Sequence, residues 1–332
     1  MVKTFIIAEA GVNHNGNIAL AKQLIDSAVE AGVDAVKFQT WKTELLVSKD
    51  AEMAAYQIEN THKKESQFEM LKRLELSYPD FIELKAYCDT KNILFLSTPD
   101  EHESARFLNG LQSVFKIGSG ELTNVPFLRL IAGFGKPVIL STGMGYLSEV
   151  EQALFVLTEA GLALTDITVL HATTDYPTAP QDVNLRAMLT IQNAFPGVKV
   201  GYSDHTLGIE VSVAAVALGA SIIEKHFTLD KAMPGPDHKA SLEPAELKAL
   251  VQAIRNVEAS LGDGRKLPTS TEMVNRKLVR KSIIANTYIS AGTEITADML
   301  DVRRPGDGIS PSRWDEVIGS IAKKDYQSGD LI

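Results

Sequence analysis

Hydrophobic and polar positions divide the chain into short apolar runs separated by longer amphipathic stretches. The runs are continuous and rich in β-branched residues, which is typical of parallel strands buried on both faces, and helical stretches between them predict parallel crossovers. Eight such runs occupy residues 4–11, 34–40, 93–99, 114–121, 137–144, 167–174, 198–205 and 221–227. Eight units over about 260 residues favour an α/β fold of the closed (β/α)8 TIM-barrel type over an open doubly wound sheet.

The first crossover illustrates the helical pattern. Apolar residues recur at helical spacing at Ile18, Ala21, Leu24, Ile25, Ala28 and Val29. Gly32 follows where a C-terminal cap belongs, so we expect an amphipathic helix that packs on the barrel. No GxGxxG motif follows the first run, which further disfavours a dinucleotide-binding fold.

The barrel pattern ends near Gly262, and the remainder of the chain has a different pattern of apolar and polar residues. Residues 263–281 are polar and basic and are predicted to be a linker. Residues 282–332 contain short strand-like runs between Gly, Pro and Asp turns. About 50 residues bury little core, so we expect this unit to lean on the barrel, residues 1–262, or on another subunit.

Composition narrows the classes of function. The net charge of -9 argues against nucleic-acid binding, which needs clustered Lys and Arg. With 45% hydrophobic and 23% charged residues, no membrane association is expected. The single cysteine, Cys88, excludes an internal disulfide and a multi-cysteine zinc site, and its helix-like surroundings favour a buried structural role over a nucleophile. The first apolar run is interrupted by Glu9, too early for a signal peptide, so the expected location is cytoplasmic.

Two histidines stand at the ends of the last two apolar runs. His205 closes VKVGYSDH and His226 lies in SIIEKHF, 21 residues later. Because strand ends of a parallel barrel converge on one face, the two imidazoles can hold a divalent metal whose shell is completed by water or substrate. The alternative is that both histidines only pack against their neighbours.

Polar residues also end the other runs, where barrel enzymes build their sites. They comprise Glu9, Thr98, Lys116, Ser119, Glu121, Ser141, Thr174, Tyr176 and Ser203. A lysine, several hydroxyls and the glycine-flanked amides at Gly118 and Gly120 are suited to binding phosphate.

Three carboxylates have two interpretations each. Glu9 and Glu121 are candidates for proton transfer or for orienting a hydroxylated substrate, or else they form structural salt bridges with Lys37 or Lys116. Asp237 lies in a Pro-Gly turn, PGPDH, from which it could bind a sugar hydroxyl, and His238 beside it is a candidate third metal ligand. A purely structural turn explains that segment equally well.

The motifs together resemble the bacterial sialic acid synthase family over nearly the entire chain. They are AEAGVNHNG, VKFQT, LSTP, FKIGSGE, ILSTGM, GYSDHT, EKHFT, PGPDH and RRPGDG, in this order. The resemblance implies a (β/α)8 barrel joined to a small C-terminal antifreeze-like domain (SAF, of the β-clip type). It also implies a transferase that condenses phosphoenolpyruvate with N-acetylmannosamine or a related 2-acetamido sugar. A divalent metal is implied as well, with manganese expected and magnesium or cobalt as alternatives.

The resemblance further implies roles for individual positions. His205 and His226 match metal ligands, and Glu9 matches the acidic residue near the reacting carbons. Residues that match the phosphoenolpyruvate site are Lys116, Ser119, Ser141, Thr98 and Ser203. Glu121, Tyr176 and Asp237 match sugar-side positions. Arg304 matches an arginine that reaches the N-acetyl group in the other subunit's site, which implies a domain-swapped homodimer.

Two departures from the family pattern leave the sugar open. Asp100 stands where the family often has Phe, and Thr174 stands where it can have Asn. The main expectation is an N-acetylneuraminate synthase. The alternative is an N,N'-diacetyllegionaminate synthase that uses 2,4-diacetamido-2,4,6-trideoxymannose, and a remote alternative is a non-catalytic carbohydrate-binding protein.

Overall fold

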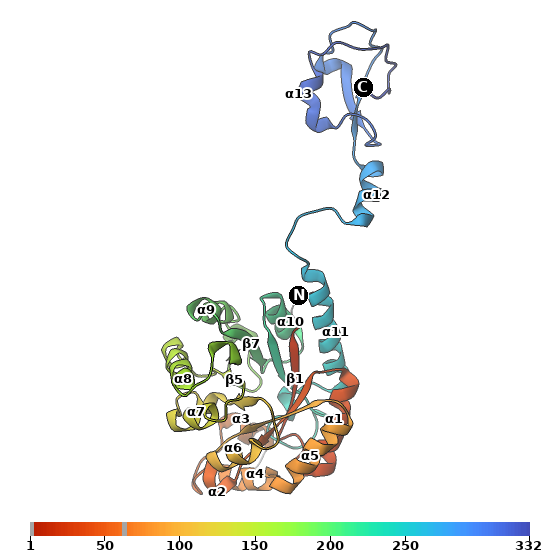
Figure 1. Cartoon of the computed structure of the whole chain (residues 1–332). Coiled ribbons are helices and arrows are strands. Elements are labelled where there is room, and N and C mark those ends of the chain that lie inside the picture. Colours follow the sequence, from red (N-terminus) through yellow and green to blue (C-terminus); the bar gives the residue numbers. More distant parts are fainter. Residues whose placement is uncertain (1–2, 62–64) are drawn as a thin grey trace. The chain divides into compact units, whose positions relative to one another are not determined.

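Eight parallel strands form a nearly closed ring in the computed structural model, which describes residues 3–61 and 65–332 (Figure 1). The strands are β1 (Phe5–Gly11), β2 (Ala35–Thr40), β3 (Leu94–Pro99), β4 (Phe115–Ile117), β5 (Val138–Ser141), β6 (Ile167–Ala172), β7 (Lys199–Asp204) and β8 (Ile222–His226). Their hydrogen-bonded order is β3-β2-β1-β8-β7-β6-β5-β4, and the two end strands, β3 and β4, contact each other. The expected (β/α)8 barrel is therefore confirmed.

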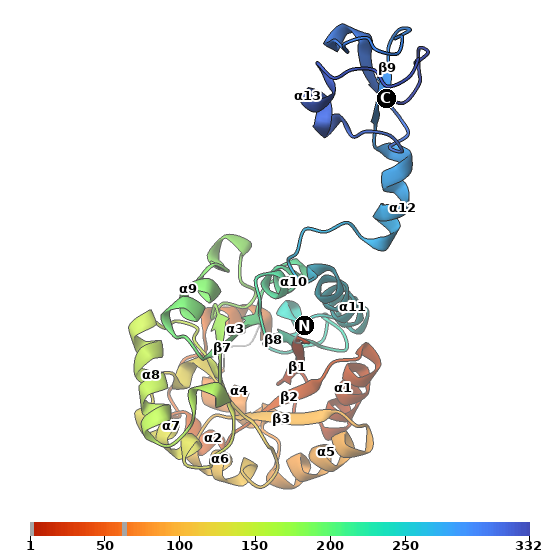
Figure 2. The same cartoon turned by 45° about the horizontal axis from the view of Figure 1, so that its top comes forward.

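Helices α1 (Ile18–Ala31), α5 (Tyr78–Thr90), α6 (His102–Leu108), α7 (Val125–Ala132), α8 (Leu147–Glu159), α9 (Ala187–Ala194), α10 (Glu210–Ala217) and α11 (Pro244–Leu261) surround the strands on the outside of the ring (Figure 2). Three further helices are α2 (Thr43–Leu46), α3 (Ala55–Thr61) and α4 (Gln67–Leu74). The long connection between β2 and α5 holds α2, α3 and α4. Cys88 is buried on α5, as its surroundings predict.

Helix α1 follows the physical rules that its sequence suggests. The Asn17 side chain accepts hydrogen bonds from Ala19 N and Leu20 N at the N-terminus. Gly32 ends the helix in the left-handed region at φ 79°, and its N–H bonds the carbonyls of Ala28 and Val29. The apolar face of α1 is buried against the barrel, so the predicted helix is confirmed.

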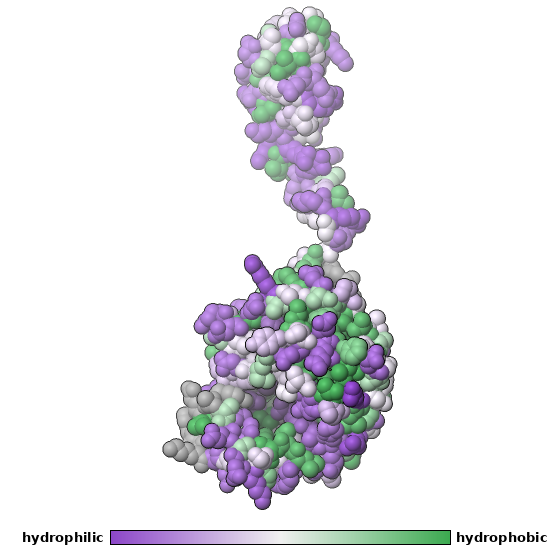
Figure 3. Space-filling model, turned by 90° about the vertical axis from the view of Figure 1, so that its left-hand side faces the viewer, coloured by the Kyte–Doolittle hydropathy of each residue, from purple (hydrophilic) through white to green (hydrophobic). Residues whose placement is uncertain are grey.

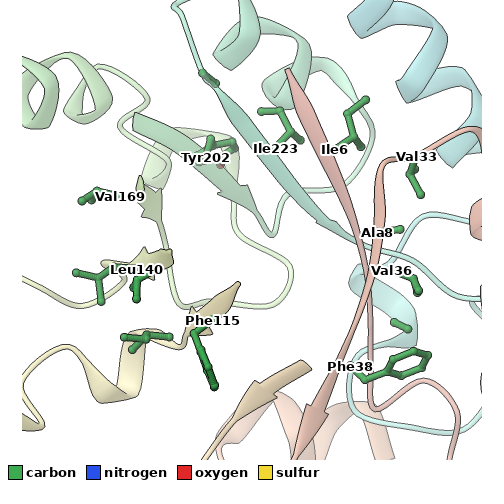
Figure 4. Packing of buried hydrophobic residues seen from close by; sticks show 14 of the residues in the cluster. Ile6, Ala8, Val33, Val36, Phe38, Phe115, Leu140, Val169, Tyr202 and Ile223 are labelled. Carbon is green, nitrogen blue, oxygen red and sulfur yellow. The ribbon is translucent and has the colours of Figure 1, made fainter. Parts of the chain in front are cut away.

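Each strand presents one set of side chains to the helices and the other set to the barrel interior. The outward set forms the main core, and in Figure 4 side chains such as Phe38, Val169 and Ile223 lie on the outside of the ring. The inward set begins with an apolar layer made by Ile7, Ala35, Leu96, Ile139, Leu170 and Ile222. Further along the strands the inward residues become polar, and this change creates the site described below.

Residues Asp263–Ile332 form a second compact unit. Strands β9 (Ser282–Ala285) and β10 (Leu300–Arg303) pair antiparallel, and a short helix, α13 (Trp314–Val317), follows. The core of this unit consists of Ile283, Ala285, Ile289, Ile295, Leu300, Val317, Ala322 and Tyr326. The expected small C-terminal domain is therefore present.

The segment predicted as a linker contains one helix, α12 (Ser270–Val279). Thr269 and Glu272 form a capping box at its start, and none of its residues is buried. Its apolar residues Met273, Val274, Leu278 and Val279 are exposed, so the cap and the good helix formers account for α12, whereas the polar and basic composition of the segment indicated a linker.

The surface of the chain mixes hydrophilic and hydrophobic residues on the face drawn in Figure 3. Within residues 3–61 and 65–332, every helix is too short or too polar to cross a membrane.

Candidate active site

A cavity of about 210 Å³ opens at the carboxyl ends of the barrel strands. It is lined by Glu9, Lys37, Gln39, Thr98, Asp100, Lys116, Gly118, Ser119, Gly120, Ser141, Met144, Thr174, Tyr176, Ser203, His205, Glu224 and His226. Polar side chains dominate this lining, unlike the apolar layer beneath it. The structure thus gathers most of the residues that the strand ends predicted.

Four charged side chains form the base of the cavity. Lys37 Nζ lies 2.7 Å from Glu9 Oε2 and 3.8 Å from Glu224 Oε2. Lys116 Nζ lies 3.5 Å from Glu224 Oε1. All four are nearly fully buried, at 5% side-chain exposure or less. Charges removed from water in this way must be balanced by one another or by a ligand.

The two carboxylates of this cluster differ in protonation. Burial raises the pKa of Glu9 to about 8, because the opposing effect of Lys37 is too small to offset the loss of solvent. Burial also acts to raise the pKa of Glu224, but Lys116 and Lys37 outweigh it and lower that pKa to about 2. When Glu9 is protonated, Lys37 and Lys116 face one ionised carboxylate, which favours an anionic ligand, while burial acts to lower the pKa of Lys116.

Directed donors accompany the lysines. Lys116 Nζ donates to Ser141 Oγ at 2.7 Å, and Lys37 Nζ donates to Thr98 Oγ1 at 2.8 Å. Ser119 Oγ accepts from the amide of Gly143 at 3.0 Å. Ammonium groups, hydroxyls and a glycine-rich turn in one cavity are the components of a phosphate or carboxylate site.

The two histidines lie side by side, with ring centroids 5.4 Å apart. His205 Nδ1 is 2.6 Å from the carbonyl oxygen of Thr173, to which it donates, so Nε2 carries a lone pair. Burial lowers the pKa of both rings, and for His226 the neighbouring His205 adds to the effect. The Tyr176 ring stacks on His205 with centroids 4.1 Å apart.

Two buried polar atoms of the cavity wall lack a hydrogen-bond partner in the described part of the chain. They are Glu224 Oε2 and His226 Nδ1, whereas Glu9 Oε2 is paired with Lys37 Nζ at 2.7 Å. Each such atom costs about 1–3 kcal/mol unless something in the cavity satisfies it. Gly11, just past Glu9, makes room here: a Cβ at this residue would lie 3.3 Å from Glu9 Oε1.

Three of the predicted site residues stand apart from the cavity wall. Glu121 is half-buried and accepts a hydrogen bond from Asn124 Nδ2 at 2.5 Å. Asp237 is buried, with Oδ2 4.0 Å from His226 Nδ1, and burial raises its pKa to about 6. Arg304 is exposed and belongs to the second unit.

The third metal ligand considered, His238, is used elsewhere. Its Nδ1 lies 2.7 Å from Thr228 Oγ1 and its Nε2 lies 3.3 Å from Asn15 Oδ1, so both ring nitrogens support loops. Over the described residues, no group of three or more His, Cys, Asp or Glu side chains could hold a metal ion. His205 and His226 therefore stand as a pair.

Two charged residues of the cavity were missed as site residues, because each lies inside an apolar run. Lys37 was considered only as a structural partner, and Glu224 was not considered, yet both lie at the base of the cavity. The alternation of side chains along each strand could have revealed them. Lys37 pairs in register with Glu9, and Glu224 pairs with Ser203, so both line the barrel interior beside a predicted site residue.

A polar, cation-bearing cavity at the carboxyl end of a (β/α)8 barrel defines this chain as a barrel enzyme. Comparison with known families gives the particular group. Residues 24–266 match the NeuB family and residues 280–332 match the SAF domain, and the chain belongs to the NeuB family. The resemblance to the sialic acid synthases is confirmed, and the non-catalytic alternative is set aside.

Similar proteins cover almost the whole chain. An N,N'-diacetyllegionaminic acid synthase of Campylobacter jejuni is 50% identical, over 100% of this chain and 99% of its own length. An enzyme with the same name from Legionella pneumophila is 48% identical, over 99% and 93%. The crystal structure of an N-acetylneuraminic acid synthetase from Leptospira borgpetersenii has a TM-score of 0.72 and 34% identity, covering 82% of this chain and 90% of its own.

Proposed function

We propose that this enzyme condenses phosphoenolpyruvate with 2,4-diacetamido-2,4,6-trideoxymannose and releases N,N'-diacetyllegionaminate and phosphate. Two relatives at 50% and 48% identity carry the name of that activity, which favours it over the N-acetylmannosamine reaction that was the main expectation. N-acetylneuraminate synthesis is the second candidate, supported by the likeness to the Leptospira enzyme.

The observation that carries the proposal is the pair of buried lysines beside the two histidines. Lys37 and Lys116 are both nearly excluded from water, and each donates to a hydroxyl at the cavity wall. Phosphoenolpyruvate carries a phosphate and a carboxylate, and two ammonium groups in a poorly solvated site can bind both. With Glu9 protonated, a neutral ligand would leave the two ammonium groups facing the single carboxylate of Glu224.

The rim of the cavity favours an uncharged sugar. Within the described lining, the cations are Lys37 and Lys116, and both are committed to the base. Asp100 also lines the cavity, where burial raises its pKa to about 7, and Glu149 lines an adjoining cavity of about 170 Å³. A sugar phosphate would meet carboxylates there, whereas hydroxyl and acetamido groups can donate to them.

A divalent metal fits the two histidines. Neutral imidazoles are good ligands, and the unpartnered His226 Nδ1 and the lone pair of His205 Nε2 are available. An ion held there, for which manganese is proposed, supplies Lewis-acid polarisation of a substrate carbonyl. Cobalt is an alternative that accepts imidazole ligands, whereas magnesium prefers oxygen ligands and fits a pair of histidines less well.

The protein's own groups would serve the remaining steps. C3 of phosphoenolpyruvate bonds to the sugar's aldehyde carbon, water adds at C2, and phosphate leaves with cleavage of its C–O bond. Lys116 and Ser141 would hold the phosphate oxygens through these changes of charge. Water that adds at C2 must lose a proton, and the ionised form of Glu9, whose pKa is about 8, would accept it.

The second unit is proposed to complete the site of a second subunit in a domain-swapped homodimer. Arg304 would then meet the acetamido group of the sugar, and Glu121, Tyr176 and Asp237 would contact its hydroxyl groups. An Arg side chain exposed on its own unit is free to serve a neighbouring barrel.

A sugar panel tests the proposal. Phosphate release from phosphoenolpyruvate is measured with manganese and with either 2,4-diacetamido-2,4,6-trideoxymannose, N-acetylmannosamine or N-acetylmannosamine 6-phosphate. We expect the largest kcat/KM for the first sugar and the smallest for the sugar phosphate. A higher kcat/KM for N-acetylmannosamine would replace the proposal by its second candidate, and no phosphate release with any sugar would refute both.

A further inference from the structure

Behind the two histidines, on the outer side of the barrel wall, lies an ion pair that the proposed reaction does not use. Asp204 precedes His205 and Lys225 precedes His226, so strand alternation turns both charged residues away from the cavity. They face each other in the β7–β8 ladder, with Lys225 Nζ 2.9 Å from Asp204 Oδ2. Both side chains are 0% exposed.

The Asp204 carboxylate is saturated with donors. Oδ1 accepts from Thr206 N at 2.9 Å and from Thr206 Oγ1 at 2.8 Å. Oδ2 accepts from Ser212 Oγ at 2.6 Å, in helix α10, in addition to Lys225. Lys225 Nζ donates to the carbonyl of Thr206 at 2.5 Å. Thr206 is therefore held by its N–H, its hydroxyl and its carbonyl.

The bonds of this network fix the residues immediately before and after His205. The residues on either side of it, Asp204 and Thr206, are tied to each other and to Lys225, the neighbour of His226. His205 itself is fixed by its ring bond to Thr173 and by its carbonyl, which accepts from Thr178 N at 2.9 Å. The spacing between the two imidazoles is thus set by a link outside the cavity.

Stability alone gives no reason for such a link. A buried ion pair gains little over well-packed apolar residues of the same volume, because desolvation offsets the attraction. Outer groups that orient metal-binding histidines, in contrast, change metal affinity strongly.

We propose that Asp204 and Lys225 are a positioning pair that holds His205 and His226 at the separation needed to bind a divalent cation. The inference rests on the proposed metal site. Neither residue touches the cation or the substrates; both act through the backbone of the histidine that follows them.

The test uses the full-length protein and direct binding of Mn²⁺, followed by the electron paramagnetic resonance signal of the free ion. The double variant Asp204→Asn/Lys225→Met removes the ion pair without leaving a lone buried charge, and Asn keeps an oxygen for Thr206. We expect Mn²⁺ affinity to fall by about 10- to 100-fold. Tm should change by no more than about 4 °C.

Two further variants keep the test decisive. Thr206→Val removes only the hydroxyl bond to Asp204 and should weaken Mn²⁺ binding less than the double variant does. Tyr202→Phe removes a hydroxyl 3.4 Å from Asp204 Oδ1 on the same outer face and should leave the affinity unchanged.

Each outcome has one meaning. Weaker Mn²⁺ binding by the folded double variant, graded through Thr206→Val, supports the positioning role. Unchanged affinity in Thr206→Val and in the double variant overturns it, as does unchanged affinity in Thr206→Val when the double variant does not fold. If the wild-type protein binds no Mn²⁺, the metal site itself is refuted and this inference falls with it.

Discussion

Glu9 and Glu224 show how two identical side chains acquire different states within one cavity. Glu224 faces Lys37 and Lys116, which keep its pKa near 2, whereas Glu9 has Lys37 as its close partner and a pKa near 8. Burial is nearly complete for both, so the difference arises from their neighbours: Ser203 donates to Glu224, whose charge in turn raises the pKa of Glu9. This difference gives the base of the cavity one fixed negative charge and one exchangeable proton.

The raised pKa of Glu9 predicts a pH-dependent cost to folding. Between its ordinary pKa of 4.5 and its folded value of about 8, the folded protein holds a proton that the unfolded chain has released. The contribution of Glu9 to stability therefore falls as pH rises through this window and is constant above it. Glu9→Gln cannot ionise, so its stability relative to wild type should increase with pH over the same range.

Urea unfolding of both proteins at a series of pH values measures this difference. Gln39→Asn, at a cavity residue that cannot ionise before or after the change, is the control and should show no such trend. A Glu9→Gln difference that stays constant from about 4.5 to about 8 would contradict the assignment of the proton.

Lys116 gives a second prediction at this scale. Lys116→Met keeps the length of the side chain but removes the ammonium group that faces Ser141 and Glu224. The loss of a direct phosphate contact should cost about 2–4 kcal/mol of transition-state stabilisation. Steady-state kinetics with varied phosphoenolpyruvate measure it, and Lys199→Met, at an exposed position on the other end of the barrel, should behave as wild type.

At the scale of elements, the barrel could be predicted because each strand repeats one signal. Eight apolar runs with helical connections require a buried parallel sheet, and the predicted cap at Gly32 is present. The polar residues at the ends of these runs predicted the site, and Lys116, Ser141 and the two histidines do line the cavity. Lys37 and Glu224 were not recognised as site residues, because a charge inside an apolar run can equally be a structural ion pair.

Other parts of the site depend on contacts that sequence patterns do not encode. Asp237 approaches His226 only through the path of the loop after β8. The network of Asp204 and Lys225 needs the register of two strands 21 residues apart in sequence. Helix α12 has a cap but no buried face, and the polar composition of its segment indicates a linker rather than a helix.

In the loop between β1 and α1, Gly16 occupies a position where a side chain should destabilise the protein. This glycine has φ 72°, and a Cβ there would lie 2.5 Å from the carbonyl oxygen of Arg73, which is backbone that cannot easily yield. Gly16→Ala should destabilise the protein by more than the ~1 kcal/mol typical of a positive φ alone. Thermal unfolding measures the change.

Gly219→Ala isolates the backbone strain, because Gly219 has φ 99° and open space around its Cβ direction. The loss at Gly16 should exceed the loss at Gly219. Equal losses would show that the loop shifts away from Arg73 without cost.

For the whole molecule, the proposed domain-swapped homodimer can be tested at Arg304. Arg304→Ala should raise the KM for the sugar or lower kcat while Mn²⁺ binding is unchanged, because the arginine is proposed to act on the sugar alone. Mixing this chain with an inactive His205→Ala chain should restore part of the activity, since one hybrid site then combines an intact barrel with an intact arginine.

Activity after mixing, with subunit exchange verified by two affinity tags, measures the effect. Each variant incubated alone is the control. Exchange without recovered activity would place Arg304 outside the site of the other subunit.

The apolar layer across the barrel also closes one end of the cavity. Lys37 and Lys116 pair in register with Leu96 and Ile139, two members of that layer, so they lie at the blind end of the cavity. A second cavity, of about 260 Å³, begins on the far side of the same layer. If the proposed substrates bind as described above, we expect the ligand of the lysines to bind before the sugar, which would otherwise block the cavity. Such an order would follow from the shape of the barrel and would require no moving gate.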